Sequence, residues 1–459
     1  MKSYIVSLEI IFLSLLIPWG INSQKAIVAL ITVLLLIYNT FKIRNGYTLL
    51  LLTMALCIPN TSNASDESIS KVFSLLFHVI RIGILFTLIF QCFVLKIKNN
   101  IIPRSLKYVI IAFIFLNFFY AVAFNDFSLF LNGCFYYPIT TYAFLYITYN
   151  DNINLEKSSK LFDFIFAIFS FYVILEFVFN ISPYDFLYNN FLDVLNIESI
   201  GRAKGLLGHP LMVSCVVLLY EVFLLYRLVK KEKVIIQIIL CIIIGILTVS
   251  RTTYLFGLIE IFFWIILNKK YKSSTFYLLF ISFLIISLWI ITNMMNEYIN
   301  DVIYRFQNDN IDQRLGAFDI VSKLLSKHPL GCGSDFFSTI RKEGISNALF
   351  TNTFETLDNY FLTQLSIYGY LGILVFVYDY FFAIRICIHG KIFKQISPHI
   401  ILLFIVRFVM SFSFDVHAYM IFNMIFYYIL AFVIKSEKLN FKTKNKSIIT
   451  KHGCFYYNR

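Results

Sequence analysis

Long apolar runs separated by short polar segments extend along the chain from its first residues to about residue 434. An α-helix needs roughly 20 apolar residues to cross a bilayer core about 30 Å thick. Runs of this size recur throughout, and the shorter ones indicate half-spans. The predicted spans lie at about 4–21, 26–41, 47–59, 72–95, 106–124, 127–149, 161–181, 208–229, 234–249, 252–267, 275–293, 359–384, 398–413 and 418–434.

Composition supports the same class. The chain is 59% hydrophobic and only 14% charged, and its mean hydropathy is +0.76, which excludes an ordinary soluble domain. The first run is preceded only by Lys2, lacks a small-residue cleavage site and is followed at once by a second span. It therefore reads as a span rather than as a signal peptide. We expect an all-α polytopic membrane protein with about 12–14 transmembrane helices.

The positive charge sorts by loop. The net charge is +13, and about 26 of the 39 basic residues fall in one alternate set of loops and the tail. The positive-inside rule assigns this set to the cytoplasm, so both termini are predicted inside a bacterial cytoplasmic membrane. The charge therefore indicates membrane topology rather than nucleic-acid binding. No nucleotide-binding motif appears on the inner side, which argues against an ATP-driven pump.

The organisation that follows is one transmembrane bundle, 1–434, interrupted by one long outward loop, 294–358, and followed by a basic cytoplasmic tail, 435–459. Eight cysteines are scattered without a C-x-x-C pair, which argues against disulfides and structural zinc. Asp309 and Asp312 read as solvated rather than as metal ligands. We expect neither a metal nor a cofactor.

Basic residues are rare on the predicted outer side, so each one needs a reason. Arg251 lies in the turn TVSRTTY between two apolar runs, among Thr248, Ser250, Thr252 and Thr253. A guanidinium is a planar, permanently charged fork suited to phosphate oxygens, and the hydroxyls satisfy backbone groups or donate to an anion. On the outer face of the cytoplasmic membrane, the substrate that matches this chemistry is a lipid-linked phosphate. The alternative is a polar turn with a snorkelling arginine.

The segment GRAKGLLGHP, 201–210, adds Arg202 and Lys204 among three glycines, with His209 and Pro210 at the start of the next span. Glycines allow backbone amides to approach an anion, and a helix N-terminus favours negative charge. On its own the segment reads equally as an ordinary loop that leads into a helix.

Two further arginines lie inside predicted spans. Arg407, in IVRFVM, is about two turns below the outer surface, and Arg81 is deeper. A central arginine costs at least about 2.5 kcal/mol on insertion scales, so each should face a cavity or a partner. The partner would be a substrate or a buried acid such as Glu176 or Asp415.

The long outward loop contains an amphipathic pattern over 312–329. Leu315, Phe318, Val321 and Leu325 follow three-and-four spacing, which predicts a helix lying on the membrane surface. Asp319, Lys323 and Lys327 lie on its other face. HPLGCGSDFF then predicts a tight turn, and the remainder of the loop is predicted to be polar and mobile. A loop of this length is more often functional than accidental.

Asp358, Asn359 and Tyr360 stand where the chain re-enters the membrane, in TLDNYFLTQLSIYGYLGILVF. A carboxylate at a helix start is a preferred N-cap, and this is the simpler interpretation of Asp358. The functional interpretation is a general base that faces the cavity lined by Arg251.

These pieces, in this order, resemble the O-antigen polymerase/ligase superfamily of bacterial membrane glycosyltransferases. The matching segments are GRAKGLLGHP, LTVSRTTY, the loop start at Arg314 and Leu315, KHPLGCGSDFF, and DNYFLTQLSIYGYLGILVF. The resemblance covers about residues 200–380. Each motif is degenerate, so its specificity lies in order and spacing.

The resemblance implies a GT-C-like helical fold and transfer of a glycan from a polyprenyl-pyrophosphate carrier at the outer leaflet. It implies that Arg251 and Arg202 hold the pyrophosphate and that Arg314 lies near the acceptor or the same phosphates. Fixed guanidiniums would stabilise the charge that develops on the leaving pyrophosphate. Lys204, Arg407, Asn359 and Tyr360 are further candidate substrate-binding residues. The expected partners are lipid-linked oligosaccharides, membrane lipid and a chain-length regulator protein, with no nucleic acid.

One position departs from part of the superfamily. Ligases that transfer O-antigen to lipid A-core carry a histidine where this chain has Asp358, and DNY resembles the Wzy-type repeat-unit polymerases. We therefore expect a polymerase of O-antigen or capsule repeat units. A ligase of the same fold and a lipid-linked oligosaccharide flippase are the alternatives, and His328 and His209 are the alternative bases.

Overall fold

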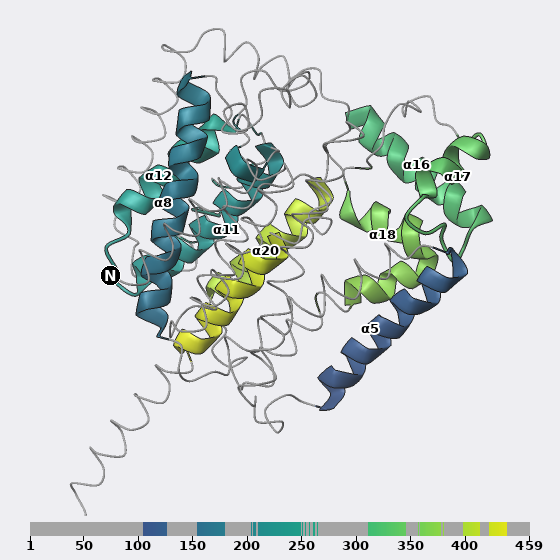
Figure 1. Cartoon of the computed structure of the whole chain (residues 1–459), viewed down its shortest axis with the longest axis horizontal. Coiled ribbons are helices and arrows are strands. Elements are labelled where there is room, and N and C mark those ends of the chain that lie inside the picture. Colours follow the sequence, from purple (N-terminus) through teal and green to yellow (C-terminus); the bar gives the residue numbers. More distant parts are fainter. Residues whose placement is uncertain are drawn as a thin grey trace, which may run out of the picture.

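A computed structural model gives the arrangement of the chain (Figure 1). Every regular element in its described residues is a helix. The residues it describes are 104–125, 154–179, 203, 205–207, 210–248, 250, 253, 257, 260–261, 264, 311–345, 357, 359–377, 380, 398–413 and 422–437.

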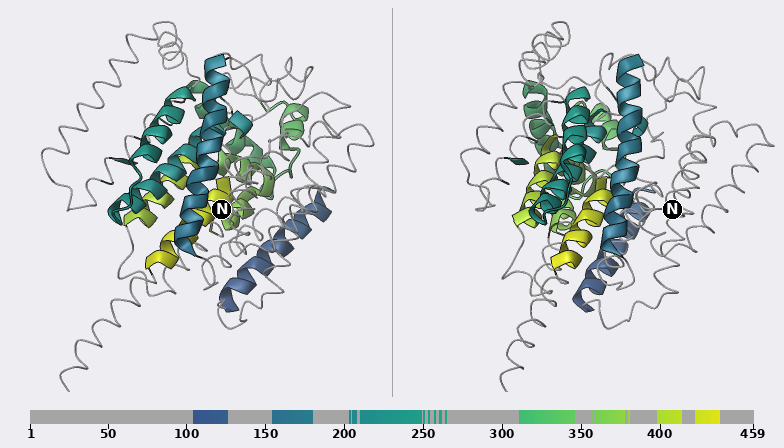
Figure 2. Two further views of the ribbon diagram at one scale, coloured as in Figure 1. Left: turned by 60° about the vertical axis from the view of Figure 1, so that its left-hand side comes forward. Right: turned by 90° about the vertical axis from the view of Figure 1, so that its left-hand side faces the viewer.

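One group of helices forms a tight bundle. α8 (Leu155–Phe179) and α11 (Pro210–Val229) both pack against α12 (Ile235–Leu247), and the short η3 (Gly205–Leu207) packs on α8 and α11. Figure 2 shows α8, α11 and α12 running side by side. α11 is apolar around almost its whole circumference, which is the pattern of a helix enclosed by others, and 89% of its most apolar stretch is buried.

The second group lies on the other side of the molecule (Figure 1). It contains α5 (Arg104–Ala123), α16 (Ile311–Lys327), α17 (Phe336–Lys342) and α18 (Tyr360–Tyr368), which leads into η5 (Gly369–Leu371) and a helix over 372–377. α20 (Pro398–Ser413) contacts both groups, α11 in the first and α18 in the second. A further helix spans residues 422–437.

Three helices in the described part of the chain are long and apolar enough to cross a membrane: Leu155–Phe179, Pro210–Val229 and Tyr360–Val377. Ala112–Ala123, Ile235–Leu247 and His399–Phe412 are shorter apolar helices. These features support an integral membrane protein. The predicted spans at 106–124, 161–181, 208–229, 234–249 and 398–413 are confirmed as helices. The spans before residue 104 and those at 127–149 and 275–293 lie outside the described residues, as does the tail beyond residue 437.

The described part of the predicted long loop, residues 311–345, contains the helices α16 and α17. Val321 and Leu325 are buried as predicted, together with Ala317, Ile320 and Leu324. Phe318, which shares the predicted apolar face, is 48% exposed. Here the apolar stripe follows the neighbouring three-and-four positions, because α17 and α18 occupy that side.

Two further expectations for the loop change. The apolar face of α16 packs on protein, against α17 and α18, rather than on a membrane surface. The segment from Ser338, predicted to be polar and mobile, begins within the helix α17, which starts at Phe336. Phe336 and Ile340 anchor α17 because both are buried against α16. The predicted polar face of α16 is confirmed by an ion pair between Lys323 and Asp319 (2.6 Å).

A network of charges ties α11 to α8 and to the helix over 422–437. Arg227 Nη1 lies 2.5 Å from Asp163 Oδ1 of α8, and Arg227 Nε lies 2.7 Å from Glu232 Oε2. Tyr226 donates to Glu437 (2.8 Å), which also pairs with Lys230 (2.9 Å). We call this the charged end of the bundle. Arg227 is 4% exposed, so its two carboxylate partners compensate for its burial.

Candidate functional site

The GRAKGLL segment, the Arg251 turn and the start of α18 lie at the end of the bundle opposite to the charged end. Tyr226, near the end of α11, contacts His399 at the start of α20 (ring centroids 5.3 Å apart), so these helices are antiparallel. Phe361 at the start of α18 contacts Phe412 near the end of α20 (4.6 Å). The starts of α11 and α18 therefore lie at the same end as the finish of α20. We call this the motif end.

The Arg251 turn begins at the motif end, where α12 finishes at Leu247. Residue 253 is helical again, which confirms a turn between two helices. A Cβ on Gly245 would lie 3.0 Å from the Thr253 side chain, so this glycine allows the two helices to approach closely. Arg251 itself lies outside the described residues, and its role stays a prediction.

Hydroxyl groups line this turn. Thr248 Oγ1 donates to the carbonyl of Gly245 (2.8 Å) and lies 3.2 Å from Ser214 Oγ of α11. It is also 3.5 Å from Thr253 Oγ1. Ser250 is 2% exposed, and its hydroxyl has no hydrogen-bond partner in the described part of the chain. The residue before Arg251 thus presents a buried donor that a ligand would satisfy.

The GRAKGLL segment is attached to the same turn through its backbone. Ala203 N donates to Leu247 O (3.1 Å), the last residue of α12. Gly205 N donates to Glu176 Oε2 of α8 (2.5 Å). Gly205 has a positive φ of +54°, and a Cβ there would lie 2.8 Å from Val173, so the position requires glycine.

Arg202 and Lys204 stand on either side of Ala203. Their side chains, and His209, lie outside the described residues, but the bonded position between them fixes their segment beside the Arg251 turn. Glu176, a suggested partner for a buried arginine, accepts the Gly205 amide.

The start of α18 corrects one expectation. Asn359 is its N-cap: Asn359 Oδ1 accepts a hydrogen bond from Leu362 N (3.2 Å). The capping role that was the simpler interpretation of Asp358 is therefore filled by its neighbour, because the helix begins one residue later. Asp358 lies outside the described residues. Tyr360 is fully buried, with its ring 5.7 Å from that of Phe376.

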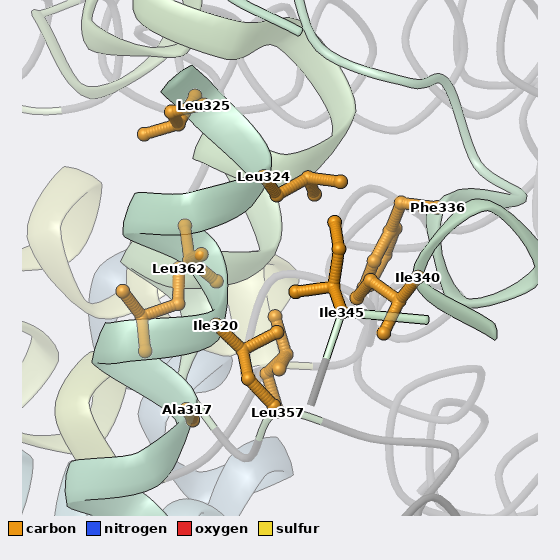
Figure 3. Close-up of a cluster of buried hydrophobic side chains, with 10 residues drawn as sticks. Ala317, Ile320, Leu324, Leu325, Phe336, Ile340, Ile345, Leu357 and Leu362 are labelled. Carbon is orange, nitrogen blue, oxygen red and sulfur yellow. The ribbon is translucent and has the colours of Figure 1, made fainter. Parts of the chain in front are cut away.

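α16 and α18 run in the same direction. Ala317, in the first half of α16, lies near Leu357, and Leu362 lies beside Ile320 (Figure 3). At the other end, the residues that follow α16 bond to the end of α18. The start of α18 therefore lies beside the middle of α16, near residues 317–320, and the first turn of α16 extends beyond it.

Arg314 belongs to the first turn of α16, and its side chain lies outside the described residues. Both helix starts carry the positive end of a helix dipole, an arrangement that favours an anion.

Two glycine turns interlock at the far ends of this helix pair. Cys332 N donates to Ser366 O (3.0 Å) and Gly333 N to Ile367 O (3.1 Å), while Tyr370 N donates to Pro329 O (2.9 Å). A Cβ on Gly331 would lie 2.3 Å from Ile367 O, and one on Gly369 would lie 2.2 Å from Pro329 O. We call the contact between residues 329–333 and 366–370 the glycine clamp. The sequence predicted the first turn but not its partner.

Arg407 is fully buried on α20 and packs on aromatic rings. Its Cζ lies 4.3 Å from the ring centroid of Phe426, 5.3 Å from that of Tyr427 and 6.0 Å from that of Tyr380. Rings of this kind stabilise a desolvated cation. Arg407 is thus held within the core, and its contact with substrate stays a prediction.

His328 lies at the clamp rather than at the start of α18. Its Nε2 is hydrogen-bonded to Glu343 Oε1 beyond α17, and Lys327 is 3.3 Å from the other oxygen of that carboxylate. The hydrogen bond from His328, followed by that from Lys327, lowers the pKa of Glu343 below its ordinary value. His328 thus lies at the opposite end of α18 from its N-cap Asn359, and its role stays a prediction.

Sequence reasoning missed two residues that build the site, Tyr120 and Asn117, and named Glu176 only as a partner for a buried arginine. Tyr120 and Asn117 of α5 hydrogen-bond to the clamp and to α18. The only sequence signal was their position as polar groups in apolar runs. In the described residues, no three His, Cys, Asp or Glu side chains lie together as metal ligands would.

The class that these features define is an integral membrane helical bundle with a folded loop braced at one end. Residues 236–377, from α12 through α18, match the family described as O-antigen ligase. This match supports the resemblance to the O-antigen polymerase/ligase superfamily that the motifs predicted, and it supports a role in surface polysaccharide assembly. Comparisons with curated proteins and with solved structures found no match.

Proposed function

We propose that this protein is a membrane glycosyltransferase that polymerises polyprenyl-pyrophosphate-linked oligosaccharide repeats into a surface polysaccharide. The observation that carries the proposal is the convergence at the motif end. The GRAKGLL segment bonds to the end of α12, beside the Arg251 turn. The start of α18 lies at that same end, and α16, which runs parallel to α18, begins about two turns before the level of that start.

The proposed roles follow from charge. Arg251 and Arg202 bind the pyrophosphate of the donor, and the buried Ser250 hydroxyl donates to the same oxygens. In the reaction the bond between the anomeric carbon and the pyrophosphate oxygen breaks. A hydroxyl of the acceptor sugar forms the new glycosidic bond. Asp358 takes the hydroxyl proton, and the guanidiniums stabilise the negative charge on the departing carrier pyrophosphate.

Complementation of a deletion strain tests the proposal. Arg251→Ala should abolish long polymer and cause single lipid-linked repeats to accumulate, since a fixed guanidinium stabilises the leaving group. Lys323→Ala is the matched control, because Lys323 is an exposed cation paired with Asp319 on α16. Normal polymer length and amount in Arg251→Ala, at normal protein levels, would refute the proposal.

Ser250 provides a finer comparison within the same turn. Ser250→Ala should lower polymerisation roughly tenfold, the effect of losing one hydrogen bond to a charged group. Ser159→Ala is its control, because Ser159 is equally buried but lies near the start of α8, where its hydroxyl donates to Glu156 O (3.0 Å). Equal activity of the two variants would show that the Ser250 hydroxyl does not bind the substrate.

A ligase is the second candidate, because the matching family is described as O-antigen ligase. Purified protein offered the same lipid-linked donor with either lipid A-core or a second lipid-linked repeat separates the two. A polymerase extends the second repeat and leaves lipid A-core unmodified. A flippase would transfer neither.

A further inference from the structure

The hydroxyl of Tyr120 joins three parts of the second helix group. It lies 2.8 Å from Leu330 O in the turn after α16 and 2.7 Å from Tyr368 O at the end of α18. Tyr120 itself is 1% exposed, so these are its buried hydrogen-bond acceptors. A single phenolic proton is shared between two carbonyls, one on each side of the glycine clamp.

A second bond from α5 reaches the same place. Tyr368 donates to Asn117 Oδ1 (2.7 Å), and Asn117 Nδ2 donates to Phe113 O (2.8 Å). The Tyr120 and Tyr368 rings meet edge to face at 5.0 Å. Asn117 is fully buried, one turn of helix before Tyr120. α5 therefore presents one polar face to the clamp on an otherwise apolar helix.

The clamp lies at the base of the parallel α16/α18 pair, and the predicted site residues lie at the other end. Arg314 is about 20 Å from Lys327 along α16, at 1.5 Å per residue. A tilt of about 5° at the base would move Arg314 by about 2 Å. In an active site, a displacement of about 1 Å costs on the order of 100-fold in rate.

We propose that Tyr120 is a positioning residue: by bonding to both sides of the glycine clamp, it fixes the angle of the α16/α18 pair and hence the approach of Arg314 and Asp358 to the substrate. This inference rests on the proposed function. Tyr120 touches no substrate, and its effect passes through the backbone of two helices.

The test uses the full-length protein and lipid-linked repeats purified from a strain that lacks it. Tyr120→Phe removes the hydroxyl and keeps the ring that packs on Tyr368. We expect kcat to fall about tenfold while KM stays within about twofold, because binding energy is retained and alignment is lost. Tyr370→Phe is the matched control, since Tyr370 is in the same clamp and 56% exposed.

A second readout is independent of activity. Cys332 lies within the clamp and is partly buried, and burial raises the pKa of its thiol. In a variant that keeps Cys332 as its one cysteine, maleimide should label Cys332 severalfold faster after Tyr120→Phe than after Tyr370→Phe. Asn117→Ala, which removes the acceptor of Tyr368, should also speed labelling and lower kcat.

Outcomes separate this inference from the proposed function. Wild-type kcat and labelling rate in Tyr120→Phe would overturn the positioning role, even where Arg251→Ala abolishes polymer. A loss of kcat matched by an equal loss of folded protein would also overturn it, since that result indicates only a stability role. Unchanged polymer in Arg251→Ala would instead refute the proposed function, while Cys332 labelling would still report whether Tyr120 holds the clamp.

Discussion

The two ends of the α8–α11–α12 bundle satisfy their buried polar groups in different ways. At the charged end, Arg227 lies between Asp163 and Glu232, so charge is balanced within the chain. At the motif end, backbone amides bond to Leu247 O and to the Glu176 carboxylate, and the Ser250 hydroxyl has no partner in the described part of the chain. At the charged end the buried arginine therefore has carboxylate partners within the chain, whereas at the motif end the buried Ser250 hydroxyl has no partner among the described residues.

This difference explains why the same residue type has different consequences along the chain. A buried arginine with two carboxylates contributes to stability, because removing it leaves uncompensated charge. In the proposed function, Arg251 in its turn of hydroxyls instead binds the phosphates of the substrate. Variants at the two ends should therefore separate loss of stability from loss of activity.

The largest loss of stability and activity is expected from a substitution in the glycine clamp, which lies at the end of the α16/α18 pair away from the motif end. Gly331→Ala should unfold the loop and abolish polymer, because Gly331 has φ +82° and its Cβ would lie 2.3 Å from Ile367 O. The left-handed backbone alone costs about 1–2 kcal/mol, and the clash adds to it. Thermal unfolding in detergent and polymer length measure the outcome. Gly344→Ala is the control, since Gly344 has φ +61° but open space around it. Equal losses of stability in both variants would contradict the claim that the close backbone approach in the clamp requires glycine at position 331.

The next effect belongs to the charged end. Arg227→Met should lower the free energy of unfolding by about 3 kcal/mol, because it leaves Asp163 partly buried without its cation. Activity per folded molecule should stay normal. The double variant Arg227→Met, Asp163→Asn should recover part of the stability. A variant that is stable yet inactive would show that this end takes part in the reaction.

A smaller effect is expected from the hydroxyl cluster at the Arg251 turn. Thr248→Val should cost about 1 kcal/mol of stability, the worth of one buried hydrogen bond, and should also lower activity. Ser158→Ala removes a bond of similar length to Tyr428 (2.7 Å) near the charged end. It should cost a similar amount of stability and leave activity unchanged. Equal activity in the two variants would contradict the claim that only the motif end takes part in the reaction.

The smallest effect concerns pH. The pKa of Glu343 is lowered by the hydrogen bond from His328. A carboxyl whose pKa is lowered in the folded state stabilises it above the ordinary glutamate pKa, and this contribution is lost as pH falls through the lowered value. The protection factor of the α17 amides, which corrects their exchange rates for the intrinsic pH dependence of amide exchange, should therefore fall at acidic pH. In Glu343→Gln the protection factor should be lower than in the wild type at neutral pH and nearly independent of pH over that range.

The sequence by itself determined the helical class, the positions of the described spans and the family of residues 236–377, because apolar length and motif order are local properties of the chain. It predicted α16 to within about two residues at each end. It did not distinguish Phe318, which is exposed, from Val321 and Leu325, which are buried, since three-and-four spacing fits several adjacent stripes equally well.

Only the tertiary structure decided which segments meet. The bond of Ala203 to Leu247 joins positions 44 residues apart in number, and Tyr120 reaches a helix 248 residues away. The match between the turn at Gly331 and the one at Gly369 depends on backbone atoms that approach within van der Waals distance. Such contacts depend on how helices pack, and periodicity within one segment carries no information about its neighbour.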